Sequence, residues 1–347
     1  MSSRPLTAQS TLSIQRALRT LGEMTSLGRL GFLKPSISCC AALSDVARCA
    51  AKRHTTARSE PILLRAASYF RAVSKATQTS LKRRFFITMT YCLSLSCREG
   101  IVFLSDSRSN AGMDNINVHP KLHVFQKPGE RVICLQSSGN LSITHSVLAL
   151  IEEDCLRGKR DAEHPNLLNQ LTLHETARYV GAKIREVDDL DRAHLQKDDY
   201  KFNVHFLVGG QIKGLPHQIY YVYPQGNVMH ASEDTPFLQI GESKYGKPIL
   251  DRGFKFTSSL QDAVRFGVLS MDSTMKSNVS VGPPIDVLCY QRDSFEVRQR
   301  VRLAENDPYL QEIRKRWSEG LVALGKTMPE IEFPPVPVEP KTASPCD

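Results

Sequence analysis

The chain has 347 residues, of which 41% are hydrophobic and 23% are charged. This composition provides a buried core for one large or two modest domains, and it excludes a short peptide, a collagen-like repeat and a wholly disordered chain. The net charge of +9 is uneven, because residues 1–88 hold 15 of the 45 basic and only 3 of the 36 acidic positions. Residues 89–347 therefore carry 30 basic and 33 acidic side chains, a net charge of −3. The excess positive charge belongs to the N-terminal segment, and it does not indicate a basic nucleic-acid-binding face.

The nine cysteines are scattered, with no CxxC pair and no regular spacing. This pattern argues against a zinc site and a disulfide framework, and it fits reduced thiols in the cytoplasm. His119 and His123 are four positions apart, but Pro120 and the surrounding strand pattern place them off any helix, so no metal site is expected. No run of residues approaches the roughly 18 to 20 apolar residues that a membrane-spanning helix needs. We expect a cytoplasmic protein with no metal, no cofactor, no membrane partner and no nucleic-acid partner.

Residues 1–88 are rich in Arg and Ser and show no sustained helical or strand periodicity. Three interpretations compete: an organelle transit peptide, a disordered basic arm, or a segment that is absent from the protein because translation begins at Met89. Composition alone does not choose between them. The residues after Met89 favour the third, so we expect 1–88 to be a basic extension outside the folded domain, either disordered or not part of the mature chain.

From Thr90 onward the pattern changes to short apolar, β-branched runs separated by turn residues, which is typical of strands. Strands are predicted at 90–97, 100–105, 121–125, 131–136, 202–208, 218–223, 228–230, 237–240, 285–290 and 295–301. Helices are predicted from 140 and over 173–195, 258–275 and 308–324. The order of these blocks predicts an α+β fold, a four-layer αββα sandwich of two antiparallel sheets flanked by helices, over residues 89–328. Residues 329–347 contain six of the 19 prolines and are expected to form an extended, flexible tail.

The first two predicted strands form a hairpin whose turn is expected near Arg98. This register places Thr90 opposite Asp106, and a slip of one residue would turn the two side chains to opposite faces. Methionine is readily removed before a small residue, so loss of Met89 would give Thr90 a free α-amine. An amine with a pKa of about 7.7 to 8.0 can act as the base for the threonine hydroxyl, and no separate histidine is then needed.

The residues at 100–108, GIVFLSDSR, resemble the G-x-V-x-x-A/S-D-x-R signature of proteasome-type N-terminal nucleophile hydrolases, and they follow a strand led by threonine. Lys121 comes 15 positions after Asp106, close to the place of the catalytic lysine in that family. Gly139, after Ser137-Ser138, matches the loop glycine of the family whose backbone N–H contributes to the oxyanion hole. Two later segments resemble the family more loosely. One is Ser243 in a Gly-Glu-Ser version of the G-S-G loop, and the other is Asp272 followed by Ser277-Asn278, which is similar to the Asp-x4-Thr-Asn spacing of the HslV protease.

The opening M-T-Y-C at Met89, with the signature that follows, resembles the bacterial Anbu family of ancestral proteasome-like subunits. The resemblance covers Met89 onward and none of residues 1–88. It implies a threonine-type peptidase or amidohydrolase that acts on a peptide or amide substrate within a homo-oligomer, either a ring or an open helical turn. The sequence contains no Walker A motif, so any ATP-driven unfolding would need a separate chain.

The resemblance also implies a role for each residue. The Thr90 hydroxyl would attack a carbonyl while its own α-amine accepts the proton. Lys121 would lower the pKa of that amine, and Asp106 would hold Lys121 by a charge-assisted hydrogen bond. The Gly139 N–H would stabilise the oxyanion, a contact worth about 3 to 4 kcal/mol in other enzymes. Asp272, Ser277 and Ser243 would hold the α-amine.

Simpler interpretations remain open at this stage. Asp106 and Arg108 taken alone could form a solvated ion pair at the end of a strand. Lys121 could be a charge that protects an edge strand from aggregation. Ser243 could be an ordinary loop serine. At the level of the whole protein, two alternatives to a peptidase are a catalytically weak scaffold or adaptor and a non-proteolytic amidase that acts on a small amide.

Overall fold

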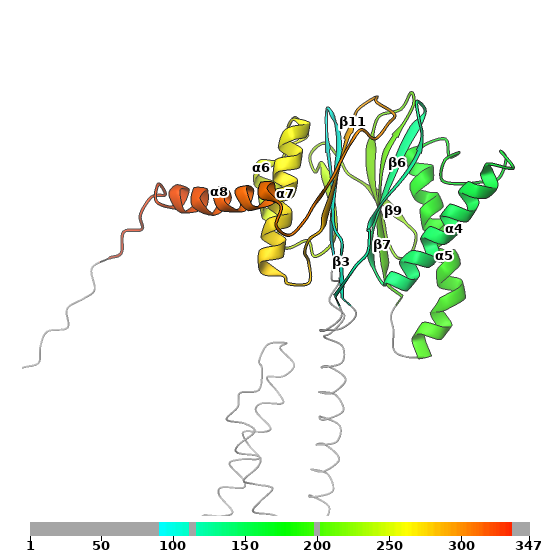
Figure 1. The fold of residues 1–347 in the computed structure, drawn as a ribbon, viewed down its shortest axis with the longest axis horizontal. Helices are drawn as coiled ribbons and strands as arrows, with labels where there is room; N and C mark the ends of the chain where they lie inside the picture. The colour runs from blue at the N-terminus through cyan, green and yellow to red at the C-terminus, as the bar shows by residue number, and fades with distance from the viewer. Residues whose placement is uncertain (1–89, 111–115, 198–201, 335–347) are drawn as a thin grey trace, which may run out of the picture. The chain divides into compact units, whose positions relative to one another are not determined.

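The computed structural model describes residues 90–110, 116–197 and 202–334. The expectations for residues 1–88 and for residues 335–347 of the tail lie outside the described residues. Two five-stranded antiparallel sheets lie face to face (Figure 1). The first has the order β10-β1-β2-β11-β12, with β1 at Tyr91–Cys97, β2 at Gly100–Asp106, β10 at Phe237–Gly241, β11 at Ile285–Gln291 and β12 at Gln299–Leu303. The second has the order β5-β6-β7-β8-β9, with β5 at Leu122–Lys127, β6 at Arg131–Gly139, β7 at Val204–Ile212, β8 at Gln218–Val222 and β9 at Val228–His230.

Helices cover the outer face of each sheet. α4 (Leu141–Gly158) and α5 (Leu173–Lys197) pack on the second sheet, while α7 (Leu260–Ser277), α6 (Lys247–Gly253) and the start of α8 (Pro308–Gly325) pack against the first (Figure 1). Three apolar layers separate the four structural layers, one between the two sheets and one beneath the helices on each side. The predicted αββα sandwich is confirmed. Because β1 and β2 lie in the middle of the first sheet, all seven residues of each are buried.

The first hairpin differs from the prediction by one residue. Its turn consists of Arg98 and Glu99, so Cys97 pairs with Gly100 and Cys92 with Ser105. This register places Tyr91, rather than Thr90, level with Asp106, so the predicted pairing of Thr90 with Asp106 is wrong. A side chain at Gly100, whose φ is +150°, would overlap the Tyr290 carbonyl of β11, so the turn closes on a glycine.

Three short elements are absent from the predictions: β3 (Arg108–Asn110), β4 (Ile116–Val118) and the seven-residue helix α6. β3 and β4 form a separate antiparallel ribbon beside the end of β2. Three-residue strands are too short to display a two-residue period, and α6 completes barely two turns. The predicted strand at 295–301 begins four residues late because Phe295 has a φ of +46°, outside the strand region.

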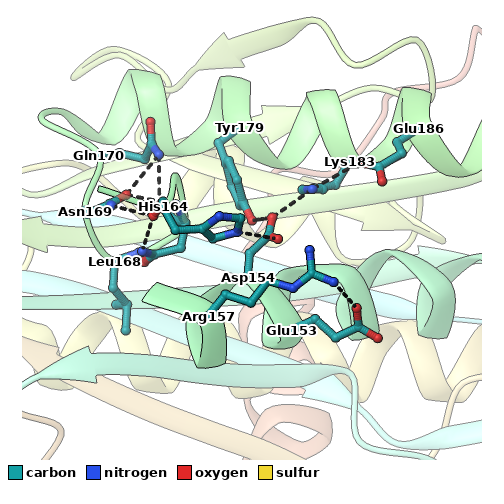
Figure 2. Close-up of polar contacts among 11 residues, drawn as sticks. Glu153, Asp154, Arg157, His164, Leu168, Asn169, Gln170, Tyr179, Lys183 and Glu186 are labelled. Carbon is teal, nitrogen blue, oxygen red and sulfur yellow. Dashed lines mark hydrogen bonds and ion pairs between the residues drawn. The ribbon is translucent and has the colours of Figure 1, made fainter. Parts of the chain in front are cut away.

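A buried carboxylate joins α4, α5 and the segment between them (Figure 2). Asp154 of α4 is 6% exposed. Its Oδ2 accepts hydrogen bonds from Tyr179 Oη and Lys183 Nζ at 2.7 Å each, and its Oδ1 lies 3.0 Å from His164 Nε2. Burial by itself raises the Asp154 pKa, but the hydrogen bonds from Lys183, His164 and Tyr179 outweigh it and lower the pKa to about 2.

Replacing this carboxylate should cost stability in a pH-dependent way. Because the folded-state pKa lies below the unfolded value of about 3.9, the ionised carboxylate stabilises the fold above pH 4, and this contribution disappears as the pH falls towards 2. We expect Asp154→Asn to lower the free energy of unfolding by about 2 kcal/mol at pH 7 and by almost nothing near pH 2. Glu153→Gln is the matched control, because this neighbouring side chain is 58% exposed and lies 3.5 Å from Arg157. Urea titrations at both pH values test this, and equal losses in the two variants would contradict it.

Candidate functional site

The predicted catalytic residues of the N-terminal half meet at the start of β1 and the end of β2. Asp106 is completely buried, and its Oδ1 accepts a hydrogen bond from Lys121 Nζ at 2.8 Å and from the backbone N–H of Tyr91 at 3.0 Å. Tyr91 directly follows Thr90, so the carboxylate ties the lysine to the backbone beside the predicted nucleophile. Lys121 Nζ also donates to the Arg108 carbonyl at 2.6 Å, which leaves the ammonium firmly positioned.

Lys121 does not serve as a solvated charge on an edge strand. β5 is an edge strand of the second sheet, but Lys121 directly precedes it and is only 6% exposed. Its charge is therefore directed inward, and the interpretation as an anti-aggregation charge is wrong. A buried ion pair carries a desolvation cost of several kcal/mol per ion, so it is a poor way to stabilise a fold. Such a pair next to a threonine is typical of a functional site.

The environment of Asp106 acts on its pKa in opposing directions. Complete burial is the strongest influence and raises the pKa above the usual carboxyl value, while the Lys121 ammonium and the Tyr91 N–H favour the ionised form and act in the opposite direction. The carboxylate, the ammonium and the peptide N–H thus form one coupled unit. Removing either charge leaves the other buried without its countercharge.

The Gly-Glu-Ser loop lies directly against Thr90. The N–H of Glu242 donates to the Thr90 carbonyl at 2.8 Å, and Asn278 Nδ2 donates to Glu242 Oε2 at 3.3 Å. A side chain at Gly241, whose φ is +86°, would overlap the Thr90 carbonyl, so this close approach requires glycine. The structure therefore brings the loop that carries Ser243, and the Ser277-Asn278 segment through Glu242, to the same end of β1.

Gly139 ends β6 and directly precedes Asn140, the N-cap residue of α4. It is exposed, it has a φ of +115°, and a side chain there would overlap the Asn203 carbonyl. The Asn140 side chain caps α4 by accepting hydrogen bonds from the N–H groups of Ser142 and Ile143. The glycine that the sequence points to thus lies at a helix N-terminus, where partial positive charge favours an anion.

Asp272 has a different partner from the expected one. This buried residue of α7 accepts a hydrogen bond from Arg314 Nε of α8 at 2.7 Å, and Ser277 is exposed at the C-terminal end of α7. Among the contacts of the described residues, neither side chain is hydrogen-bonded to Thr90. In this chain Thr90 follows Met89 through a peptide bond, so its nitrogen is an amide and the expected contacts to a free α-amine have no counterpart.

Sequence reasoning missed two residues that shape this site. Tyr91 is completely buried, and its hydroxyl is hydrogen-bonded to Ser270 of α7 at 2.7 Å and to Gln239 of β10, which anchors the start of β1 to both neighbours. Burial raises the Tyr91 pKa to about 12, so the phenol stays protonated. Glu242, the second missed residue, bridges Thr90 and Asn278. The sequence could have indicated Glu242, because it lies in the middle of the Gly-Glu-Ser loop that was predicted to be part of the site.

The described part of the chain contains no group of three or more His, Cys, Asp or Glu side chains arranged to hold a metal ion. Within the same residues, no helix combines the length and the apolar character needed to cross a membrane. The five cysteines at described positions, Cys92, Cys97, Cys134, Cys155 and Cys289, are free thiols.

Two helix-covered antiparallel sheets, with a threonine before β1 and a buried lysine–aspartate pair beside it, define a proteasome-like fold of the N-terminal nucleophile type. The Proteasome subunit family model matches residues 170–289. Proteasome subunit beta 2 of Pyrobaculum islandicum is 22% identical over 214 residues, which cover 60% of this chain and 93% of that protein.

Comparison with solved structures identifies the family more specifically. Anbu (ancestral beta-subunit) from Yersinia bercovieri is 44% identical with a TM-score of 0.65, and the match covers 71% of this chain and all of that one. The Anbu complex from Pseudomonas aeruginosa, solved as a helical assembly, is 42% identical with a TM-score of 0.66 over 70% of this chain and 98% of that one. The chain belongs to the Anbu family of proteasome-like N-terminal nucleophile hydrolases.

Proposed function

We propose that this protein is a threonine-type amide hydrolase that cleaves peptide or small-amide substrates with Thr90 as the nucleophile, once the residues before Thr90 have been removed. The observation that carries the proposal is the completely buried Asp106 carboxylate. It accepts hydrogen bonds from Lys121 Nζ and from the backbone N–H of Tyr91, the residue after Thr90. A fixed ammonium therefore lies beside the start of β1. A cation there favours the unprotonated form of a nearby amine and the ionised form of a nearby hydroxyl.

In the proposed reaction, Thr90 Oγ attacks the amide carbonyl and its proton passes to the Thr90 α-amine through a water molecule. The N–H of Gly139 stabilises the negative charge of the tetrahedral oxygen. The amine then returns the proton to the departing nitrogen, the C–N bond breaks, and water hydrolyses the acyl-threonine ester. Ser243, Ser277 and Asp272 are proposed to orient the α-amine, with Asp272 itself held by Arg314.

We further propose that the chain works as a homo-oligomer, a ring or an open helical turn. The Pseudomonas aeruginosa relative, solved as a helical assembly, supports this part of the proposal.

The position of the N-terminus tests the proposed mechanism. Two forms of the gene can be expressed, one beginning at Met1 and one at Met89, and the N-terminal peptide and the turnover of a panel of fluorogenic peptide amides are measured for each. We expect turnover only in preparations whose chains begin at Thr90, because an amide nitrogen cannot accept the proton. Equal specific turnover from chains that retain the residues before Thr90 would contradict the free-amine mechanism.

A further inference from the structure

Three histidines meet beside the buried lysine–aspartate pair without being part of it. His119 and His123 lie two residues before and two residues after Lys121, and His145 lies on α4. The rings of His119 and His145 pack edge to face, with their centroids 5.9 Å apart. His123 is close enough to His145 for that side chain to act on its pKa. We call these three residues the histidine cluster.

The first two histidines are held next to the lysine–aspartate pair and face α4. The N–H of His119 donates to the carbonyl of Ser107 at 2.9 Å, and Ser107 directly follows Asp106. His123 is the second residue of β5. The side chains of both turn towards α4, because His145 of that helix is a neighbour of each.

The third histidine lies one turn into the helix that follows the predicted oxyanion glycine. A helix rises 1.5 Å per residue, so His145 lies about 6 Å along α4 from Leu141. One residue of an extended peptide spans about 3.5 Å. When a scissile carbonyl lies at the Gly139 N–H, the side chain of the residue that supplies this carbonyl is therefore the substrate group nearest to the cluster.

The cluster has hydrogen-bonding capacity that the fold does not use. His123 Nε2 is shielded from solvent and has no hydrogen-bond partner among the described residues. Burial has the largest effect on the His123 pKa and lowers it, and the charges of His145 and Arg300 act in the same direction, while the Pro120 carbonyl and Asp286 oppose them. An unsatisfied buried nitrogen is unfavourable, so a ligand that pairs with it gains affinity.

The charges around the cluster favour a negative ligand. Asp286 of β11 is buried, and its Oδ1 lies 3.9 Å from Arg300 Nη2 and 3.6 Å from Arg302 Nε. Two guanidinium groups against one carboxylate leave a net positive charge there, and the pair of Asp106 and Lys121 is neutral. The three imidazoles are not arranged as ligands of a metal ion. The expected ligand is therefore an anion.

We propose that the histidine cluster binds the carboxylate of an Asp or Glu side chain on the substrate residue that supplies the scissile carbonyl. The carboxylate accepts hydrogen bonds from imidazole N–H groups, and His123 Nε2 takes up a proton from solvent as the carboxylate arrives. His119 and His145 form the open side of the cluster, through which the side chain enters. The inference rests on the proposed function and specifies its substrate class.

The first test is a panel of fluorogenic peptide amides that differ only in this residue, which is Glu, Gln, Leu or Lys. For chains that begin at Thr90, we expect kcat/KM to be at least about tenfold higher for Glu than for Gln. Gln has nearly the same shape without the charge, so the ratio of the two values cancels effects on the nucleophile. The ratio should fall as the pH rises from about 6 to about 8, because imidazoles lose their protons in this range. A ratio of one or less would overturn the inference.

Variants of the exposed histidine test which residues recognise the substrate. His145→Glu should lower the ratio of Glu to Gln by about tenfold or more and make Lys the preferred residue, while His145→Arg should keep the preference for Glu. His174→Glu is the matched control, because His174 is an exposed histidine of α5 outside the cluster. An unchanged ratio in His145→Glu, or an equal change in His174→Glu, would contradict the inference. Circular dichroism and melting temperature show whether each variant is folded.

Binding to the Thr90→Ala protein separates this inference from the proposed chemistry. Calorimetry compares acetylated tetrapeptide amides that end in Glu or in Gln, and we expect at least about tenfold tighter binding of the Glu peptide, lost when His145→Glu is added. If this preference is found but the wild type cleaves none of the panel, only the proposed hydrolysis fails. If the wild type cleaves the panel and neither kcat/KM nor binding favours Glu, only the inference about the histidine cluster fails.

Discussion

Thr90→Ala is expected to lower the turnover of peptide amides by about 10³-fold or more while leaving the fold and the assembly unchanged. The substitution removes the attacking oxygen and keeps the α-amine, so the remaining site binds substrate but cannot form an acyl intermediate. Thr90→Ser keeps a hydroxyl at the same position and should retain activity within about tenfold. The measurement is kcat/KM together with the mass of the assembled protein.

A second threonine provides the matched control. Thr176 of α5 is buried like Thr90, and its hydroxyl donates to the carbonyl of Thr172, directly before the helix. Thr176→Ala should leave kcat/KM unchanged within about threefold. If Thr90→Ala shows the same turnover as the wild type, the protein is not a Thr90 hydrolase, and a scaffold that retains the fold of the family becomes the better account.

Lys121→Met should abolish detectable turnover and destabilise the protein at the same time. It leaves the Asp106 carboxylate buried without its cation, and breaking a buried pair in this way costs about 3 to 5 kcal/mol. The loss of activity alone would not distinguish a catalytic lysine from a structural one. To distinguish these two roles, a variant is needed that lacks the lysine but regains the stability of the wild type.

The double variant Lys121→Met with Asp106→Asn supplies that comparison. It removes both charges, and the Asn side-chain oxygen can still accept the Tyr91 N–H, so most of the free energy of unfolding should be recovered. Turnover should stay at least about 10²-fold below wild type, because the ammonium near Thr90 is still missing. If stability and kcat/KM both return, the pair is structural and Lys121 has no part in the reaction.

The residues near the hairpin show what sequence patterns predict well. The runs at 90–97 and 100–105 predicted the two central strands. The resemblance to proteasome-type hydrolases, in which a lysine follows the aspartate at about this distance in the sequence, pointed to Asp106 and Lys121, whose side chains the structure places 2.8 Å apart. The register was predicted one residue off, because hydrophobic patterns alone do not distinguish a two-residue turn from a three-residue one when both strands are completely buried. The first strand alternates at Leu93-Ser94-Leu95-Ser96, but the second is apolar throughout Ile101–Leu104, so its sequence does not show which side chains share a face with those of the first.

Other features depend on distant parts of the chain and left no local signal. Arg314 reaches Asp272 from 42 positions away, and Tyr91 contacts Ser270 from 179 positions away. Glu242 bridges Thr90 and Asn278 only in the folded chain, where the start of β1, the loop after β10 and the end of α7 lie together. The exposed half of α8 was predicted as an ordinary amphipathic helix, because a sequence pattern defines an apolar face and does not say whether that face ends inside or outside the domain.

The most direct test of the central claim is the identity of the acylated residue in the active protein. The purified assembly is treated with a β-lactone, which acylates an activated hydroxyl, and inhibition is followed while the intact mass and the labelled peptide are determined. The account predicts that loss of turnover parallels the addition of one acyl group per active site, carried by Thr90 at the N-terminus of the chain. Inhibition with the label on another residue, or on a chain that retains the residues before Thr90, would contradict it.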